Sequence, residues 1–167
     1  MNKAIFLDRD WTLNYDSGYV YKLDDLKILE WVKEWLHELL WMGYKLIIIS
    51  NQSWIWRWYY NIKDCNKFND ELQKQLWIQF DDIYICPHSN KDNCDCRKPK
   101  ILNIEKAIKK FNLDIQKCFF VWDKESDIQT WINAWCKTVL ISNNKYECSL
   151  EPDYRAKNIL EFVKMIK

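Results

Sequence analysis

Short apolar runs recur along the chain, and amphipathic segments lie between them. Each run is rich in β-branched or aromatic side chains at consecutive positions. Unbroken runs of this kind are typical of strands that are buried on both faces of a sheet. We therefore expect strands over residues 4–7, 45–49, 83–85, 118–122 and 138–141.

The segments between these runs carry apolar residues at helical spacing, for example Val32, Leu36 and Leu39. This spacing predicts helices near residues 32–40, 68–76, 101–111 and 159–166. Strands that alternate with helices indicate an α/β fold, a Rossmann-like and mostly parallel sheet flanked by helices. No repeat or linker divides the sequence, so we expect a single domain over residues 1–167.

Charge and hydropathy argue against several classes of partner. The chain has 25 Lys and Arg against 24 Asp and Glu, and this balance gives no basic excess for nucleic acid or an anionic membrane. No apolar run is long enough to cross a bilayer, and no secretion signal is recognisable. We expect a cytoplasmic monomer that acts on a small molecule.

Polar residues follow three of the predicted strands. Asp8, Ser50 and Asp123 come after strands, and ligands of open α/β sheets bind at that edge. Asp8 and Asp10 lie two residues apart, so one carboxylate can attack phosphorus while the other transfers protons. This attack requires charge neutralisation by Mg²⁺, and Asp123 could complete that site with Asp8. For any one of these residues alone, a solvated loop or a helix cap is the better interpretation.

Two further motifs offer groups that bind phosphate. Residues 50–53 place hydroxyl and backbone N–H groups after a strand. Arg97 and Lys98 offer a guanidinium fork and a point charge. A basic pair alone is more often solvated. Together with the carboxylates, however, these motifs give a strong indication of a phosphate site, because they occur in this order at strand ends.

Three cysteines and one histidine are grouped at the spacing of a metal site. Cys86 and His88 are separated by five residues from Cys94 and Cys96. Three thiolates and one imidazole fill the four positions of tetrahedral zinc, which is typical of a structural ion. We expect Zn²⁺ to staple the loop that precedes Arg97.

The order of the motifs resembles the haloacid dehalogenase superfamily, and more narrowly the D-glycero-D-manno-heptose 1,7-bisphosphate phosphatase family. The stretches that carry the resemblance are FLDRD over residues 6–10, DSGYV over 16–20, SNQS over 50–53, CPH over 86–88, CDCRKP over 94–99 and DK over 123–124. The resemblance implies a haloacid dehalogenase-like fold and removal of the 7-phosphate, which leaves the 1-phosphate for nucleotide-heptose biosynthesis. The alternative enzyme is a histidinol-phosphate phosphatase, which shares the zinc loop, or another small phosphomonoester phosphatase.

The resemblance also implies a role for each motif residue. Asp8 is the nucleophile that becomes phosphorylated, and Asp10 is the general acid and then the general base. Ser50 and Lys98 stabilise the transferring phosphoryl group. The Mg²⁺ ligands are Asp8, the backbone carbonyl of Asp10, and Asp123. The Zn²⁺ ligands are Cys86, His88, Cys94 and Cys96. The substrate contacts are Asp16, Ser17, Gly18, Tyr19, Asn51, Gln52, Ser53, Arg97 and Lys124.

The chain departs from this family at its glycines. It has 2 glycines and 11 tryptophans, whereas ordinary usage predicts roughly 12 glycines. Tryptophan stands where the family has glycine at positions 11, 54, 56, 58, 122, 131 and 135, and where glycine is usual at positions 31 and 77. Our hypothesis is that UGA, a glycine codon of the source organism, was read as tryptophan. The alternative is that the tryptophans are genuine core aromatics, in which case the chain is an inactive, zinc-containing binding module whose Trp11 and Trp122 block phosphate.

Overall fold

A parallel sheet forms the centre of the chain, of which the computed structural model describes residues 1–18, 20–122, 134–141 and 151–167. The described strands are ordered β3-β2-β1-β4-β5-β6, and all of their pairings are parallel. The strands are β1 (Ala4–Leu7), β2 (Lys45–Asn51), β3 (Asp82–Cys86), β4 (Phe119–Trp122), β5 (Lys137–Ile141) and β6 (Tyr154–Ala156). Because β1 lies between β2 and β4, the residues after β1 open at the middle of the sheet edge.

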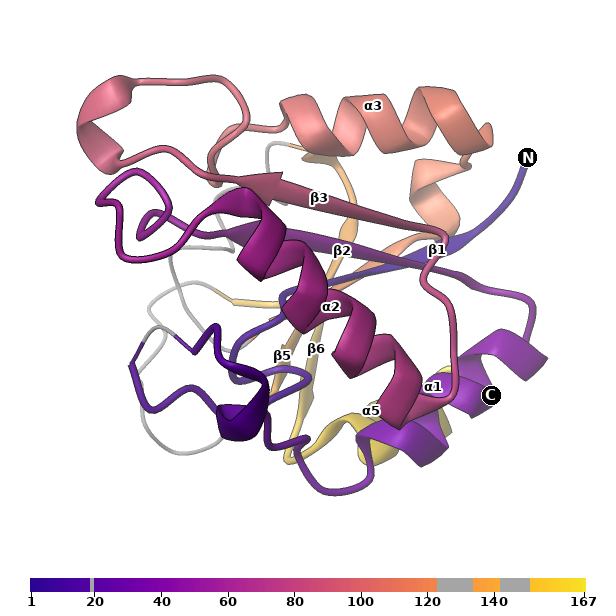
Figure 1. Cartoon of the computed structure of the whole chain (residues 1–167). Coiled ribbons are helices and arrows are strands. Elements are labelled where there is room, and N and C mark those ends of the chain that lie inside the picture. Colours follow the sequence, from indigo (N-terminus) through magenta and orange to yellow (C-terminus); the bar gives the residue numbers. More distant parts are fainter. Residues whose placement is uncertain (19, 123–133, 142–150) are drawn as a thin grey trace.

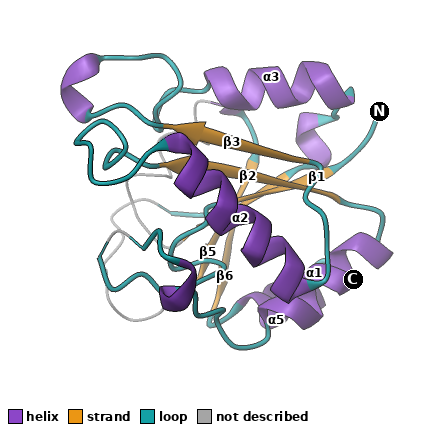
Figure 2. Cartoon of the chain, viewed as in Figure 1, coloured by secondary structure: helices purple, strands orange, loops and turns teal. Residues whose placement is uncertain are grey.

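Helices cover both faces of this sheet (Figures 1 and 2). One face packs on α1 (Val32–Trp41), α2 (Ile62–Leu76) and α5 (Ile159–Met165), and the other packs on α3 (Leu102–Phe111). Successive residues of β1 alternate between the faces: Ile5 joins the first core cluster, and Phe6 joins the second. Within the described residues, no helix is both long and apolar enough to traverse a membrane.

The predicted α/β alternation is confirmed, with two differences. Helix α2 begins six residues before the predicted start. The Asn61 side chain accepts hydrogen bonds from the backbone N–H groups of Lys63 and Asp64, and the Asp64 carboxylate accepts one from the Asn61 N–H, which caps the helix at this point. Strand β6 was missed, since its three residues centre on the exposed Arg155 and form no apolar run.

Several tryptophans occupy a backbone conformation that favours glycine. Five of those described have φ between 58° and 65°, namely Trp11, Trp31, Trp58, Trp77 and Trp135. Both glycines of the chain also have positive φ. Trp77 is the left-handed residue that ends α2, a position where glycine is usual. These five are among the nine positions of the hypothesis of tryptophan in place of glycine, whereas Trp54, Trp56 and Trp122 do not have positive φ.

Two other tryptophans lie in the core. Trp35 on α1 and Trp122 at the end of β4 have fully buried rings. Trp122 packs in the core cluster that contains Phe6 and Phe120, on the α3 face of the sheet. Neither indole N–H has a hydrogen-bond acceptor in the part of the chain that the structure describes. A buried donor without a partner costs about 1–3 kcal/mol, so these rings fit the core imperfectly.

Candidate active site

A carboxylate and a buried lysine meet directly after β1. Asp8 Oδ2 lies 2.8 Å from Lys98 Nζ, and the Lys98 side chain is 2% exposed. The other oxygen of Asp8 accepts a hydrogen bond of 2.7 Å from the backbone N–H of Arg9. The Asp8 side chain keeps 13% of its surface exposed. The structure thus brings together two residues 90 positions apart that the motifs placed at one edge.

The second carboxylate, Asp10, is enclosed by hydrogen-bond donors. Arg9 donates to both oxygens, through Nε at 2.9 Å and Nη2 at 3.1 Å. Gln52 donates from 2.8 Å and Asn14 from 3.2 Å. Burial by itself raises the pKa of Asp10, but the charge of Arg9 and the hydrogen bonds from Arg9, Gln52 and Asn14 outweigh it and lower the pKa below its ordinary value. The ionised form held here is the one that accepts a proton.

Sequence reasoning missed the part of Arg9 in this arrangement. The Arg9 residue is 1% exposed, and its guanidinium group also donates to the Val20 carbonyl and lies over the Phe68 ring. The sequence did contain a signal for this role, since Arg9 lies between two aspartates directly after an apolar strand. Its buried charge requires a counter-charge, and Asp10 supplies it.

The residues after β2 hold one another in a hydrogen-bonded chain. Gln52 Nε2 donates to Ser50 Oγ over 2.8 Å as well as to Asp10, and Tyr60 donates to Gln52 Oε1 over 2.6 Å. Gln52 is 4% exposed. Ser50 and Asp10 thus accept from the same Gln52 amide group, at the sheet edge where the motifs placed both residues. We expected the Gln52 side chain to contact substrate, but in the structure it forms hydrogen bonds with protein groups.

Asn51 ties β2 to the loop that carries Lys98. Its Nδ2 donates to the Lys98 carbonyl over 3.2 Å, and its Oδ1 accepts from the Lys98 N–H over 3.1 Å. Both hydrogen-bonding groups of the side chain are thus used on the lysine backbone. We call this pair of hydrogen bonds the Asn51 clamp.

Four potential metal ligands converge after β3. Cys86 Sγ lies 3.7 Å from His88 Nδ1 and 3.6 Å from Cys94 Sγ, while Cys96 Sγ lies 3.3 Å from His88 Nδ1 and 3.6 Å from Cys94 Sγ. All four ligand atoms lie within 4.8 Å of one another. Tetrahedral zinc with ordinary bond lengths separates its ligand atoms by about 3.5–3.8 Å. The four side chains therefore fit a zinc ion.

The other predicted substrate contacts are spread around this edge. Asp16 accepts hydrogen bonds from the Gly18 and Val20 N–H groups, and Gly18 has a φ of 120° that favours glycine. Ser17 is exposed and Ser53 is half-buried. Arg97 donates to the His88 carbonyl. The predicted residues Tyr19, Asp123 and Lys124 lie outside the described residues.

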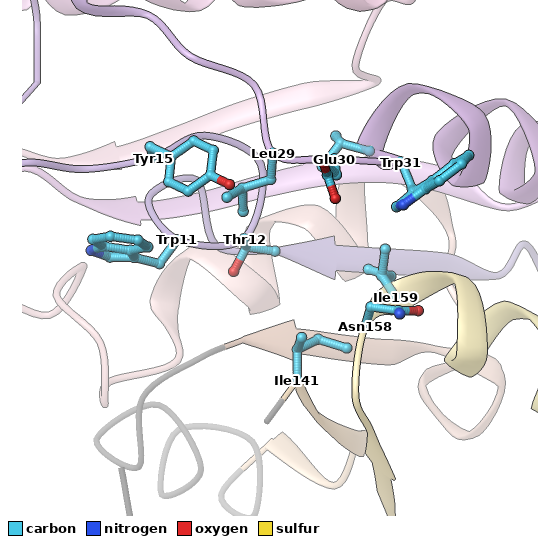
Figure 3. A pocket seen from close by; sticks show the side chains of 10 residues that line it. Trp11, Thr12, Tyr15, Leu29, Glu30, Trp31, Ile141, Asn158 and Ile159 are labelled. Atoms are coloured by element: carbon cyan, nitrogen blue, oxygen red, sulfur yellow. The ribbon is translucent and has the colours of Figure 1, made fainter. Parts of the chain in front are cut away.

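Several cavities lie near the site in the part of the chain that the structure describes. One of about 420 Å³ is lined by Lys98, Arg97, Asn51 and residues of the loop before them. Another of about 400 Å³ has Trp11 at one end and Trp31 at the other, with Thr12 and Ile159 between them (Figure 3). Only the first is lined by Lys98, so it is the one that adjoins the paired charges.

The fold is similar to that of solved haloacid dehalogenase-like proteins. Similar folds include "D,D-heptose 1.7-bisphosphate phosphatase from B. bronchiseptica", with a TM-score of 0.88, 22% identity and coverage of 99% of this chain and 98% of the other. A haloacid dehalogenase-like hydrolase of Streptococcus pneumoniae has a TM-score of 0.67 at 16% identity, with 99% of both chains covered.

Sequence comparison narrows the class. The family model described as polynucleotide kinase 3 phosphatase matches residues 3–157. A Helicobacter pylori protein named D-glycero-beta-D-manno-heptose-1,7-bisphosphate 7-phosphatase is 38% identical over 99% of this chain and 98% of its own. A Campylobacter jejuni protein, named for the alpha anomer, is 37% identical over 99% and 96%. The chain belongs to the family that this model describes and is a relative of the D-glycero-D-manno-heptose-1,7-bisphosphate 7-phosphatases, whose family it shares.

Proposed function

We propose that the chain hydrolyses the 7-phosphate of D-glycero-D-manno-heptose 1,7-bisphosphate and leaves the 1-phosphate in place. The observation that carries the proposal is the pairing of Asp8 with buried Lys98, beside a hydrogen-bonded Asp10, at the carboxyl end of β1. The names of the relatives support the choice of substrate. The general phosphatase chemistry follows from the pair of carboxylates.

The first step transfers the phosphoryl group to the protein. An oxygen of Asp8 attacks phosphorus, the bond between phosphorus and the 7-oxygen of the sugar breaks, and Asp10 gives its proton to that oxygen. Asp10 is ionised in the present arrangement, and a negatively charged phosphate beside it favours the protonated form that this step needs. Lys98 and Ser50 stabilise the charge on the phosphoryl oxygens.

The second step restores Asp8. Asp10, now ionised, takes a proton from a water molecule, whose oxygen attacks phosphorus. The bond between phosphorus and the Asp8 oxygen breaks, and inorganic phosphate leaves. The donors that surround Asp10 stabilise the ionised form that acts as the base here.

Mg²⁺ fits the oxygen donors at this edge. We propose that the Asp8 carboxylate, the Asp10 carbonyl and Asp123 hold the ion, which would neutralise phosphate charge during attack. The hard oxygen donors that follow β1 suit this cation. The B. bronchiseptica structure is described as complexed with magnesium and phosphate, which supports the proposal.

We further propose that Cys86, His88, Cys94 and Cys96 hold a structural Zn²⁺. The ligand separations given above support it, and the four side chains leave no open position for catalysis. We also propose that residues 1–167 act as one domain, as a cytoplasmic monomer. The proposed site also includes contacts with the substrate. We assign these contacts to Arg97, Lys124 and residues of the 16–19 and 51–53 segments.

The test is Mg²⁺-dependent phosphate release from both anomers of heptose 1,7-bisphosphate and from histidinol phosphate. Asp8→Asn removes the nucleophile, and Asp70→Asn, an exposed change on α2, is the matched control. We expect release from the bisphosphate that disappears only in Asp8→Asn. Release from histidinol phosphate alone would overturn the substrate assignment. If the chain releases no phosphate, restoring glycine at the tryptophan positions separates a misread enzyme from an inactive binding module.

A further inference from the structure

Tyr60 lies behind the proposed catalytic acid and is linked to it through Gln52. The Tyr60 hydroxyl donates to Gln52 Oε1 over 2.6 Å, and Gln52 Nε2 donates over 2.8 Å to both Asp10 Oδ2 and Ser50 Oγ. Tyr60 is 6% exposed and Gln52 is 4% exposed. Bulk water therefore has little access to replace these hydrogen bonds.

The orientation of the Gln52 amide is determined at both of its ends. At one end of the amide, Asp10 Oδ2 accepts a hydrogen bond from Gln52 Nε2. Tyr60 supplies the donor that the oxygen end needs. Because Ser50 Oγ accepts from Gln52, this hydrogen bond does not use the hydroxyl proton, which Ser50 can donate to a phosphoryl oxygen. One buried phenol thus supports the geometry of two functional groups.

We propose that Tyr60 is a positioning residue for phosphoryl transfer, whose hydroxyl fixes Gln52 so that Gln52 holds Asp10 and Ser50 toward the phosphoryl group. The proposal deepens the proposed function and rests on it. Tyr60 needs no contact with the substrate in this role. Its ring is itself held by stacking on Tyr21, with centroids 4.7 Å apart and an interplanar angle of 12°.

Loss of the hydroxyl has a predictable chemical consequence. In Tyr60→Phe, the Gln52 oxygen loses its donor and the amide becomes free to rotate away from Asp10. A sugar oxygen leaves only with a proton from Asp10, so a displaced Asp10 slows that substrate. Nitrophenolate departs without a proton, so its transfer depends far less on Asp10. A merely structural role of Tyr60 would slow both substrates alike.

The first test compares kcat/KM for heptose 1,7-bisphosphate and p-nitrophenyl phosphate, since kcat/KM reports the steps up to phosphorylation of Asp8. In Tyr60→Phe we expect kcat/KM for heptose 1,7-bisphosphate to fall about tenfold relative to kcat/KM for p-nitrophenyl phosphate. This is a part of the 10²–10⁴-fold rate increase that acid catalysis supplies. Tyr44→Phe, which alters an equally buried tyrosine just before β2, should leave the ratio unchanged. An unchanged ratio in Tyr60→Phe would overturn the proposal.

A double-mutant cycle tests whether Tyr60 acts through Gln52. In a Gln52→Leu background the added Tyr60→Phe change should have little further effect on the ratio, because the amide that it orients is gone. If Tyr60→Phe keeps its full effect in that background, the proposed link is wrong.

A third measurement does not depend on activity. The side-chain amide protons of Gln52, assigned in NMR spectra with Gln52→Leu, should exchange with solvent about tenfold faster in Tyr60→Phe than in the unaltered chain. Equal exchange would refute the positioning role, whether or not the chain releases phosphate. Faster exchange in a chain that releases no phosphate would support the link and count against the proposed function alone.

Discussion

Replacing three exposed tryptophans by glycine should stabilise the chain. Trp58, Trp77 and Trp135 have φ values of 62°, 58° and 60°. This left-handed conformation costs a residue with a side chain about 1–2 kcal/mol. Glycine avoids that cost but loses about 0.5–1 kcal/mol through its greater freedom in the unfolded chain. The net gain at each site is therefore about 0.5–1 kcal/mol.

Little packing is lost in exchange. The three tryptophans are 93%, 77% and 79% exposed, respectively. The contact of Lys33 with the Trp77 ring, at 3.4 Å from the centroid, is worth about 0.5 kcal/mol at such a site. Since the sites lie in separate segments, the gains add to about 1–2.5 kcal/mol. At about 2–4 °C per kcal/mol for a chain of this length, the midpoint of thermal unfolding should rise by about 2–10 °C.

The assay is urea unfolding of the triple variant, followed by far-ultraviolet circular dichroism because the changes remove indole fluorescence. Trp41→Gly is the matched control, since Trp41 is 90% exposed but lies in the right-handed last turn of α1. Glycine there should cost up to about 1 kcal/mol. The reasoning fails if the triple variant gains nothing, or if Trp41→Gly is equally stabilising. Peptide masses of the protein from its native source test the codon hypothesis, which tryptophan at residues 54, 56 and 58 would contradict.

Three other changes test the site. Cys86→Ser should abolish stoichiometric zinc binding, measured by atomic absorption, and lower the unfolding temperature, because the closed ligand set is broken; retention of zinc would contradict the ligand assignment. Asn51→Leu breaks the Asn51 clamp and should reduce kcat about 10- to 100-fold through displacement of Lys98, with unfolding curves as the control for folding. Asp10→Asn should cost about 3 kcal/mol in the free energy of unfolding at neutral pH, because Arg9 loses its buried counter-charge. Folding lowers the pKa of Asp10, so the difference in free energy of unfolding between the unaltered chain and Asp10→Asn should shrink as the pH falls below about 4. A difference that does not change with pH would contradict the assignment of Asp10 as the counter-charge of Arg9.

The sequence predicted the elements whose signal is local and apolar. Strand β1 matches its predicted range because four consecutive apolar residues end at Asp8. Strand β6 could not be found in this way, since its pairing with β5 rather than its composition makes it a strand. The start of α2 was predicted too late, although the spacing of Asn61 and Asp64 was a readable capping signal.

The same division holds for the site. Motif residues at strand ends, such as Asp8 and Ser50, were predictable because parallel strands bring their carboxyl ends together. The partners that orient them were not, since Tyr60 reaches Gln52 through a turn that carries no motif. Which atoms of Asn51 face Lys98 depends on the path of a loop almost 50 residues away. Periodicity carries no information on such contacts.

The loop before Lys98 is anchored on both sides, by the cysteine and histidine cluster and by the Asn51 clamp. Its tip, residues 89–93, lies between the two pairs of metal-ligand candidates and contributes none of them. Yet Ser89, Asn90 and Asn93 line the cavity next to Lys98. The residues of the tip can therefore change during evolution without a change in the metal-ligand candidates or in Lys98. Substitutions or insertions in the tip would alter which phosphate esters fit the cavity, while Lys98 keeps its position beside Asp8.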